Sequence, residues 1–253
     1  MKCIRRATSQ DSDIINRLRI NEFRRSTEFD LLQEDQLKWN SRDDRHIVLA
    51  AWADRLNAVS TMRAVVVSDA PEALESVQCT LPDQLAFPSI VFNSAATHMD
   101  YRGQGLNQVL RYYFLRAAIC CGIKAILSPI YRGAPRIDFM KALGYRFMTP
   151  EKSWQTKLAP KKERILGVLP RNRMGRAIDY LRTHRNEVLQ AYPWQGPLFE
   201  FPLEQRVETR IEDHHTQPPQ QKSRRLHRLA QAADGSRNRR PGADNDKGWR
   251  RAI

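Results

Sequence analysis

Residues 100–107 read Asp-Tyr-Arg-Gly-Gln-Gly-Leu-Asn, and they lie between an apolar run with high β propensity, residues 90–97, and a long amphipathic helix pattern. Gly103 and Gly105 suit a loop whose backbone comes close to a ligand, because glycine has no Cβ and accepts positive φ angles. A helix N-terminus adds unpaired N–H groups and a positive dipole end, which together bind anions. The segment is therefore typical of a pyrophosphate-binding loop with Arg102 as an added cation. An ordinary strand-to-helix turn has the same short pattern and stays an alternative.

The residues that follow the loop predict a regular alternation of elements. Apolar residues at helical spacing predict a helix over 106–121, which Gly122 ends. A short buried strand is expected over 124–130, and another helix opens at Pro135. The order is strand, glycine loop, helix, strand, helix, Gly-aromatic, strand.

That order resembles the GNAT acyltransferase superfamily. Residues 102–107 are similar to the coenzyme A motif of the family, and residues 139–145 are similar to its later helix that ends in Leu-Gly-aromatic. The resemblance covers residues 2–159. It implies an α/β (α+β) fold, with a mixed central sheet flanked by helices. It also implies an N-acyltransferase that moves an acyl group, in most cases acetyl, from acetyl-CoA or another acyl-CoA to a primary amine of a small molecule or peptide.

Two positions depart from the family pattern. Asn107 stands where the family usually has a small Gly or Ala, which bears on how closely the loop can approach the pyrophosphate. Met140 stands where many members have a tyrosine that protonates the departing thiolate. A GNAT-fold protein without catalysis therefore stays an alternative.

The resemblance also implies a set of site residues. The cofactor is expected at Thr97 and Met99, where a backbone N–H would face the thioester oxygen, and at the loop residues Arg102, Gly103, Gln104, Gly105, Leu106 and Asn107. His98 is the predicted base, because an imidazole accepts a proton near neutral pH. Tyr131 is the predicted substitute for the missing tyrosine acid. Glu22 and Asp44 are weaker candidates for the base.

A second, looser resemblance concerns residues 30–63. They are similar to the corresponding part of autoinducer synthases and long-chain N-acyl amino acid synthases, which share the GNAT fold. This resemblance implies substrate contacts at Asp44 and Arg63 and acyl carrier protein as an alternative donor. A basic surface would favour docking of such an acidic carrier.

Charge divides the 253-residue chain unevenly. The net charge is +14, and residues 217–253 contain ten Lys/Arg against three Asp, which is +7. Because this segment has few apolar residues, we expect a disordered tail. Nucleic acid is a conceivable partner of this tail, although a solvated tail is favoured. The expected organisation is an acyltransferase domain over 1–159, a helical extension over 160–202 and a basic tail over 203–253.

Two further expectations concern location and metals. The N-terminus lacks the apolar run of a signal peptide, and no apolar segment approaches the ~20 residues of a membrane span, so a cytoplasmic protein is expected. No His/Cys cluster has the spacing of a zinc site, so no metal is expected.

The rest of the chain predicts a strand over 3–7, a helix to Arg24, a hairpin of strands 46–52 and 58–67, and a short helical piece within 68–88. Three further segments complete the prediction: a second short helix or ordered loop around 29–39, a last hairpin of strands 145–148 and 154–158, and one or two helices over 165–189, interrupted by Pro170.

Overall fold

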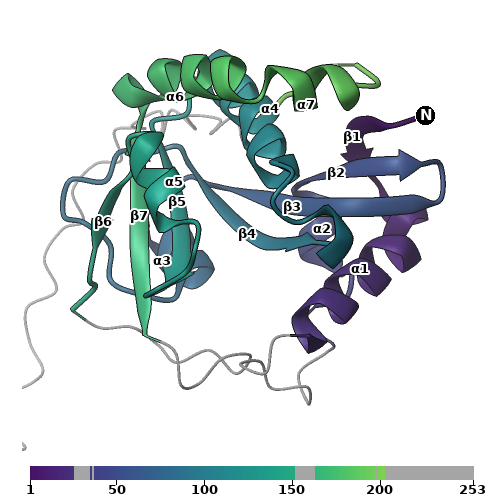
Figure 1. The fold of residues 1–253 in the computed structure, drawn as a ribbon. Helices are drawn as coiled ribbons and strands as arrows, with labels where there is room; N and C mark the ends of the chain where they lie inside the picture. The colour runs from purple at the N-terminus through teal and green to yellow at the C-terminus, as the bar shows by residue number, and fades with distance from the viewer. Residues whose placement is uncertain (26–34, 36, 152–162, 198, 203–253) are drawn as a thin grey trace, which may run out of the picture. The chain divides into compact units, whose positions relative to one another are not determined.

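The computed structural model describes residues 1–25, 35, 37–151, 163–197 and 199–202 (Figure 1). Its strands are β1 (Cys3–Ala7), β2 (Ile47–Asp54), β3 (Asn57–Val67), β4 (Ser89–Thr97), β5 (Ala125–Tyr131), β6 (Arg146–Met148) and β7 (Arg164–Pro170). Its α-helices are α1 (Ser12–Arg24), α2 (Ser41–Arg45), α3 (Ala70–Val77), α4 (Leu106–Cys120), α5 (Ile137–Ala142), α6 (Arg171–His184) and α7 (Asn186–Ala191).

The strands form one seven-stranded sheet in the order β1-β2-β3-β4-β5-β7-β6. The pairing of β4 with β5 is parallel, and the other five pairings are antiparallel. Helix α4 provides the crossover between the two parallel strands, as parallel pairs require. The predicted mixed sheet with flanking helices is therefore confirmed.

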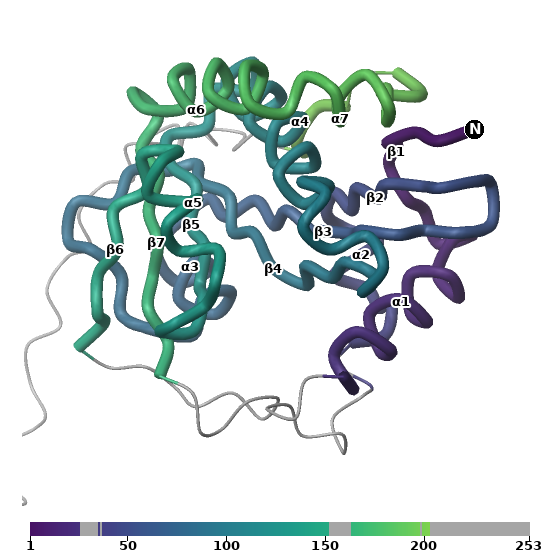
Figure 2. The backbone as a smooth tube through the Cα atoms, in the orientation of Figure 1, coloured from purple at the N-terminus to yellow at the C-terminus, as the bar shows by residue number. Residues whose placement is uncertain are grey.

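The helices cover both faces of the sheet. On one face α4 and α6 pack together over the largest apolar cluster, which includes Phe114, Ile126 and Leu181. On the other face α1 packs over β3 and β4, and α3 packs over β3, β4 and β5. The tube in Figure 2 shows α6 and α1 on opposite sides of the strands.

The helical prediction for the start of the 165–189 segment is wrong. Residues 164–170 form β7, which inserts between β5 and β6, and helix begins only at Arg171, after Pro170. The spacing of Ile165 and Leu169 suits a helix, but Leu166 and Val168 make the run apolar on both sides, which is typical of a buried strand. Pairing with two strands decided the outcome.

The described end of the C-terminal extension lies along the free edge of β1. The Ile4 N–H donates to the Pro193 carbonyl at 2.9 Å, and the Gln195 N–H donates to the Ile4 carbonyl at 2.8 Å. The edge strand thus gains main-chain partners, which protects it from pairing with other chains.

Several expectations fall outside the described residues: most of the 29–39 segment, the strand at 154–158 and the basic tail from 203 onward. The expected domain boundaries stay predictions, although β7 joins the extension to the central sheet. Within the described part of the chain, no helix combines the length and apolarity that crossing a membrane requires.

Candidate active site

Two neighbouring strands diverge at the centre of the sheet. The β4–β5 ladder ends at the pair Val91 and Leu127, although β4 continues to Thr97 and β5 to Tyr131. A bulge in β4 opposite the Thr61–Arg63 step of β3 accompanies the divergence, and Ser94 there has a φ of +49°. Bulges bend a strand and occur near active sites. Figure 1 shows β4 turning away from β5 beneath α4.

The glycine loop stands beside this divergence, at the N-terminus of α4. Gly103 and Gly105 have φ angles of +77° and +82°. A Cβ on Gly105 would lie 2.8 Å from the Cδ atom of Arg185, whose Nε donates to the Gln108 side chain. No atom of the described residues lies within 4 Å of a Cβ built on Gly103, so they leave that side of the loop open. The Gln108 N–H already donates to the Gly105 carbonyl at 3.0 Å, which leaves the N–H groups of Leu106 and Asn107, at the very start of α4, to bind an anionic group.

Arg102, the predicted cation of the loop, is held by α1. Its Nη2 donates to Glu22 Oε2 at 2.7 Å, and its Nε donates to the Thr97 carbonyl at 3.3 Å. The Glu22 side chain is buried, whereas that of Arg102 is half exposed. The contact brings Glu22, a weaker candidate for the base, to the end of β4. The predicted contact between Arg102 and pyrophosphate stays a prediction.

At the end of β4, the backbone N–H groups alternate in direction. The His98 N–H donates to Val59 of β3 at 2.9 Å. Successive residues of a strand direct their N–H groups to opposite sides, so the Thr97 N–H points away from β3, toward the divergence. Two backbone N–H groups, those of Thr97 and Met99, are predicted to contact the thioester oxygen. The Thr97 N–H is the better placed, because Met99 already begins a 3-10 turn.

The His98 side chain caps that turn. Its Nδ1 accepts from the Asp100 N–H at 3.3 Å, and the side chain is 35% exposed. With this assignment the neutral imidazole is protonated on Nε2. His98 must therefore release the Asp100 N–H before Nδ1 can take up a proton.

The two candidate acid positions differ in surroundings. Met140 is fully buried in the core, so it fills the tyrosine position with packing alone. Tyr131 lies at the end of β5, with the Arg164 guanidinium 5.9 Å from its ring centroid. By strand alternation it shares a face with Leu127, the face of α3. Its predicted acid role stays a prediction.

On the α1 face, the two predicted substrate residues are separated. Arg63 contacts Asp43, not Asp44: its Nη1 lies 3.3 Å from Asp43 Oδ2, and Arg19 Nη2 lies 2.7 Å from Asp43 Oδ1. Asp44 is exposed and accepts from Trp39 Nε1 at 2.6 Å. The buried cluster Arg19–Asp43–Arg63 thus has two cations and one anion. Burial lowers the pKa of Arg63 to about 10, although Asp43 opposes this effect.

His46 lies beside this cluster and makes stability depend on pH. Burial, with the nearby charges of Arg63 and Arg45, lowers the pKa of His46 from 6.5 to about 4. As the pH falls from 6.5 toward 4, the unfolded chain binds a proton that folded His46 does not, so stability should decrease. Urea midpoints at pH 7, 5.5 and 4.5 should fall more steeply for wild type than for His46→Asn. Parallel pH profiles of the two proteins would contradict this expectation, and His184→Asn controls for loss of an exposed imidazole.

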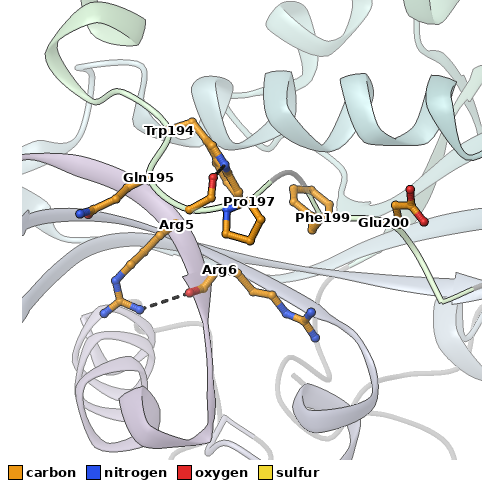
Figure 3. A pocket seen from close by; sticks show the side chains of 8 residues that line it. Arg5, Arg6, Trp194, Gln195, Pro197, Phe199 and Glu200 are labelled. Atoms are coloured by element: carbon orange, nitrogen blue, oxygen red, sulfur yellow. Dashed lines mark hydrogen bonds between the residues drawn. The ribbon is translucent and has the colours of Figure 1, made fainter.

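Two surface hollows lie away from this site, at the edge of the sheet by β1. One, of about 430 Å³, is lined by Arg5 and Arg6 and by residues 194–197, 199 and 200 of the extension (Figure 3). Strands β2 and β3 separate β1 from β4. The two hollows, with Arg5 and Arg6, are therefore not part of the candidate active site.

Comparison with known proteins supports the fold assignment. No protein-family model and no curated protein matches the chain. Among solved structures it is similar to a CoA-dependent acyl-homoserine lactone synthase, BjaI, with SAM and isopentyl-CoA, at TM-score 0.55 and 14% identity over 79% of this chain and 96% of that one. The structure of the same protein with MTA has a TM-score of 0.51 to this chain, with the same identity and coverage. FeeM, an N-acyl amino acid synthase from uncultured soil microbes, has a TM-score of 0.48 at 13% identity, over 68% of this chain and 93% of that one. The chain therefore has the fold of the GNAT superfamily.

Sequence reasoning missed three polar residues of the site. Arg19 and Asp43 form the buried cluster on the α1 face together with Arg63, and Arg111 is a buried residue of α4. Arg19 and Arg111 share a detectable signal, because each interrupts the apolar face of its helix. A charged residue there must find partners within the fold.

Proposed function

We propose that the protein transfers an acyl group from a coenzyme A thioester to a primary amine of a small molecule or peptide. The observation that carries the proposal is the divergence of β4 from β5 directly beside the glycine loop of α4. The loop offers an anion site for the pyrophosphate, and the divergence leaves unpaired strand edges for the pantetheine arm. Acetyl-CoA is the simplest such donor.

The reaction is direct attack of the amine nitrogen on the thioester carbonyl. A bond forms between nitrogen and carbonyl carbon, the carbon–sulfur bond breaks, and the amine loses one proton. The Thr97 N–H would stabilise the negative charge that develops on the carbonyl oxygen. His98 would take the proton of the amine, and Tyr131 would supply one to the leaving thiolate.

Native mass spectrometry tests the donor site without knowledge of the acceptor. Intact protein is mixed with acetyl-CoA, a long-chain acyl-CoA and acylated carrier protein in turn. We expect a 1:1 complex with a CoA thioester, and thiol release when a primary amine is added. Binding without thiol release across a broad amine panel would favour a non-catalytic GNAT-fold protein. Absence of any CoA complex would reject the proposal.

His98→Ala should lower kcat/KM at pH 7 by about 100-fold or more, the lower end of the usual contribution of a general base. Affinity for coenzyme A should stay unchanged, because the imidazole lies at the end of β4 rather than in the glycine loop. The loss should shrink at high pH, where more of the amine is already unprotonated. Near-normal turnover of His98→Ala would move the role to Glu22, which Glu22→Gln tests while a hydrogen bond to Arg102 is retained.

A second candidate function has an observation of its own. The Arg19–Asp43–Arg63 cluster has an excess positive charge on the face opposite α4, where it would attract the carboxylate of an amino-acid acceptor. This arrangement favours an N-acyl amino acid synthase or an acyl-homoserine-lactone-like synthase, with acyl-CoA or acyl carrier protein as donor. Faster thiol release with free amino acids or S-adenosylmethionine than with the corresponding amino amides would support this function.

A further inference from the structure

Arg111 is a buried cation with neutral partners. It lies on α4, is 2% exposed, and its Nε and Nη1 each donate over 3.3 Å, to Asn107 Oδ1 and to the Tyr145 hydroxyl. Its guanidinium lies 5.2 Å from the ring centroid of Phe92. Among the described residues, no carboxylate forms an ion pair with it. Asn107, which departs from the family pattern, thus helps to orient this arginine.

The guanidinium lies where β4 and β5 part. Phe92 and Ser128 are the residues that directly follow the last pair of the ladder, Val91 and Leu127. Phe92 belongs to the cluster under α4, and so do Ile126 and Ile130, the neighbours of Ser128 on its side of β5. By strand alternation Ser128 therefore faces α4 as well. Arg111 and Ser128 thus flank the closed end of the divergence.

Ser128 is itself unsatisfied. It is 1% exposed, and its Oγ has no hydrogen-bond partner within the described part of the chain. A buried hydroxyl without a partner and a buried guanidinium without an anion are each unfavourable. The contrast with Arg19 is direct, since that equally buried arginine contacts Asp43 at 2.7 Å. One anionic oxygen-bearing ligand would pair with the Arg111 guanidinium and also accept from the Ser128 hydroxyl.

The location of Arg111 and Ser128 in the core indicates which end of an acyl-CoA could supply the anion. The pyrophosphate belongs at the open glycine loop, outside the core. Strand β4 rises about 3.3 Å per residue, so Phe92 lies roughly 16 Å from Thr97, toward the closed end. A donor whose thioester oxygen is bound at Thr97 therefore needs a long acyl chain to reach Arg111 and Ser128.

We propose that the acyl donor is a long-chain dicarboxylic acyl thioester, whose distal carboxylate is bound by Arg111 and Ser128. This inference rests on the proposed acyl-CoA function and narrows its substrate class. The transfer step is unchanged: the amine attacks the thioester carbonyl, the thiol leaves, and the distal carboxylate takes no part in bond making.

Calorimetry with matched acyl-CoA pairs tests this proposal without an acceptor. The pairs are dodecanedioyl-CoA with dodecanoyl-CoA and tetradecanedioyl-CoA with tetradecanoyl-CoA, which match in chain length but differ in the distal carboxylate. Wild type should bind at least one charged member about tenfold or more tightly than its uncharged match, as hydrogen bonds to charged groups allow. Arg111→Leu should abolish or invert this preference while affinity for free coenzyme A stays within twofold.

Arg116→Leu is the matched control, because Arg116 is an exposed arginine of the same helix. Ser128→Ala, a small change, should reduce the preference even if Arg111→Leu does not fold. Equal affinity of wild type within both pairs overturns the proposal and leaves the acyl-CoA function standing. An equal loss of affinity for free coenzyme A and for all thioesters in Arg111→Leu also overturns it, since Arg111 would then contact the phosphates. Failure of wild type to bind any coenzyme A species overturns both proposals.

Discussion

Asp43→Asn should lower the free energy of unfolding by about 3–5 kcal/mol, the usual effect of removing one partner from a buried ion pair. The carboxylate of Asp43 is shared by Arg19 at 2.7 Å and Arg63 at 3.3 Å, and all three residues are buried. Among the described residues, its loss leaves neither guanidinium an ion-pair partner. Asp43 Oδ2 also accepts from the Asn40 N–H at 3.2 Å, so the start of α2 loses a cap as well.

Urea unfolding at pH 7 measures this effect, and Asp44→Asn is the matched control. Asp44 is the adjacent carboxylate of the same short helix, but it is exposed and accepts from the Trp39 indole. Its replacement should cost less than about 1 kcal/mol. If Asp44→Asn destabilised the protein as much as Asp43→Asn, the assignment of Asp43 as the carboxylate of the cluster would be wrong.

Gly105→Val should weaken the binding of coenzyme A thioesters more than tenfold. Valine is strained at a φ of +82°, and its Cβ would lie 2.8 Å from the Arg185 side chain. The strained φ favours a shift of the loop and the contact requires a shift of Arg185 or of the loop, so the N–H groups lose their alignment toward the pyrophosphate. Titration calorimetry with acetyl-CoA measures the loss, and near-UV circular dichroism checks that the fold is retained.

Two further variants separate backbone strain from the contact with Arg185. Gly103→Val introduces the same side chain at a φ of +77°, where a Cβ meets no atom within 4 Å. The double variant Gly105→Val/Arg185→Ala removes the contact and keeps the strained φ. We expect Gly105→Val to be the weakest binder and the double variant to recover part of the affinity. Equal affinity of Gly105→Val and wild type would exclude this loop from the donor site.

Local sequence patterns were sufficient for most of the architecture. The helix over 106–121, the hairpin of β2 and β3 and the strand 90–97 follow from the spacing of apolar residues, because that spacing reports which side of an element is buried. Gly103 and Gly105 located the loop at the start of α4, since both take positive φ angles there. These features depend on residues close together in the chain.

Features that depend on distant partners required the tertiary structure. The run 164–170 became β7 because β5 and β6 supply its hydrogen bonds, and a helix would leave that place in the sheet empty. The contact between Arg102 and Glu22 joins residues 80 positions apart. The residues around Arg102 and those around Glu22 do not indicate that the two side chains are in contact.

Sequence patterns also could not tell which of two adjacent residues, Asp43 or Asp44, is buried. Adjacent residues of a helix point in different directions, so the two carboxylates are equivalent in sequence, and only the packing of α2 turns Asp43 inward to Arg19 and Arg63. The same holds for Arg111. The sequence predicts its position on α4, but it does not show that the described partners of its guanidinium are all neutral. The sequence by itself determined the elements, the fold class and the glycine loop, because these follow from local periodicity and backbone freedom. The tertiary structure alone decided which charges are buried and which partners they have, because burial and pairing depend on elements far apart in the chain.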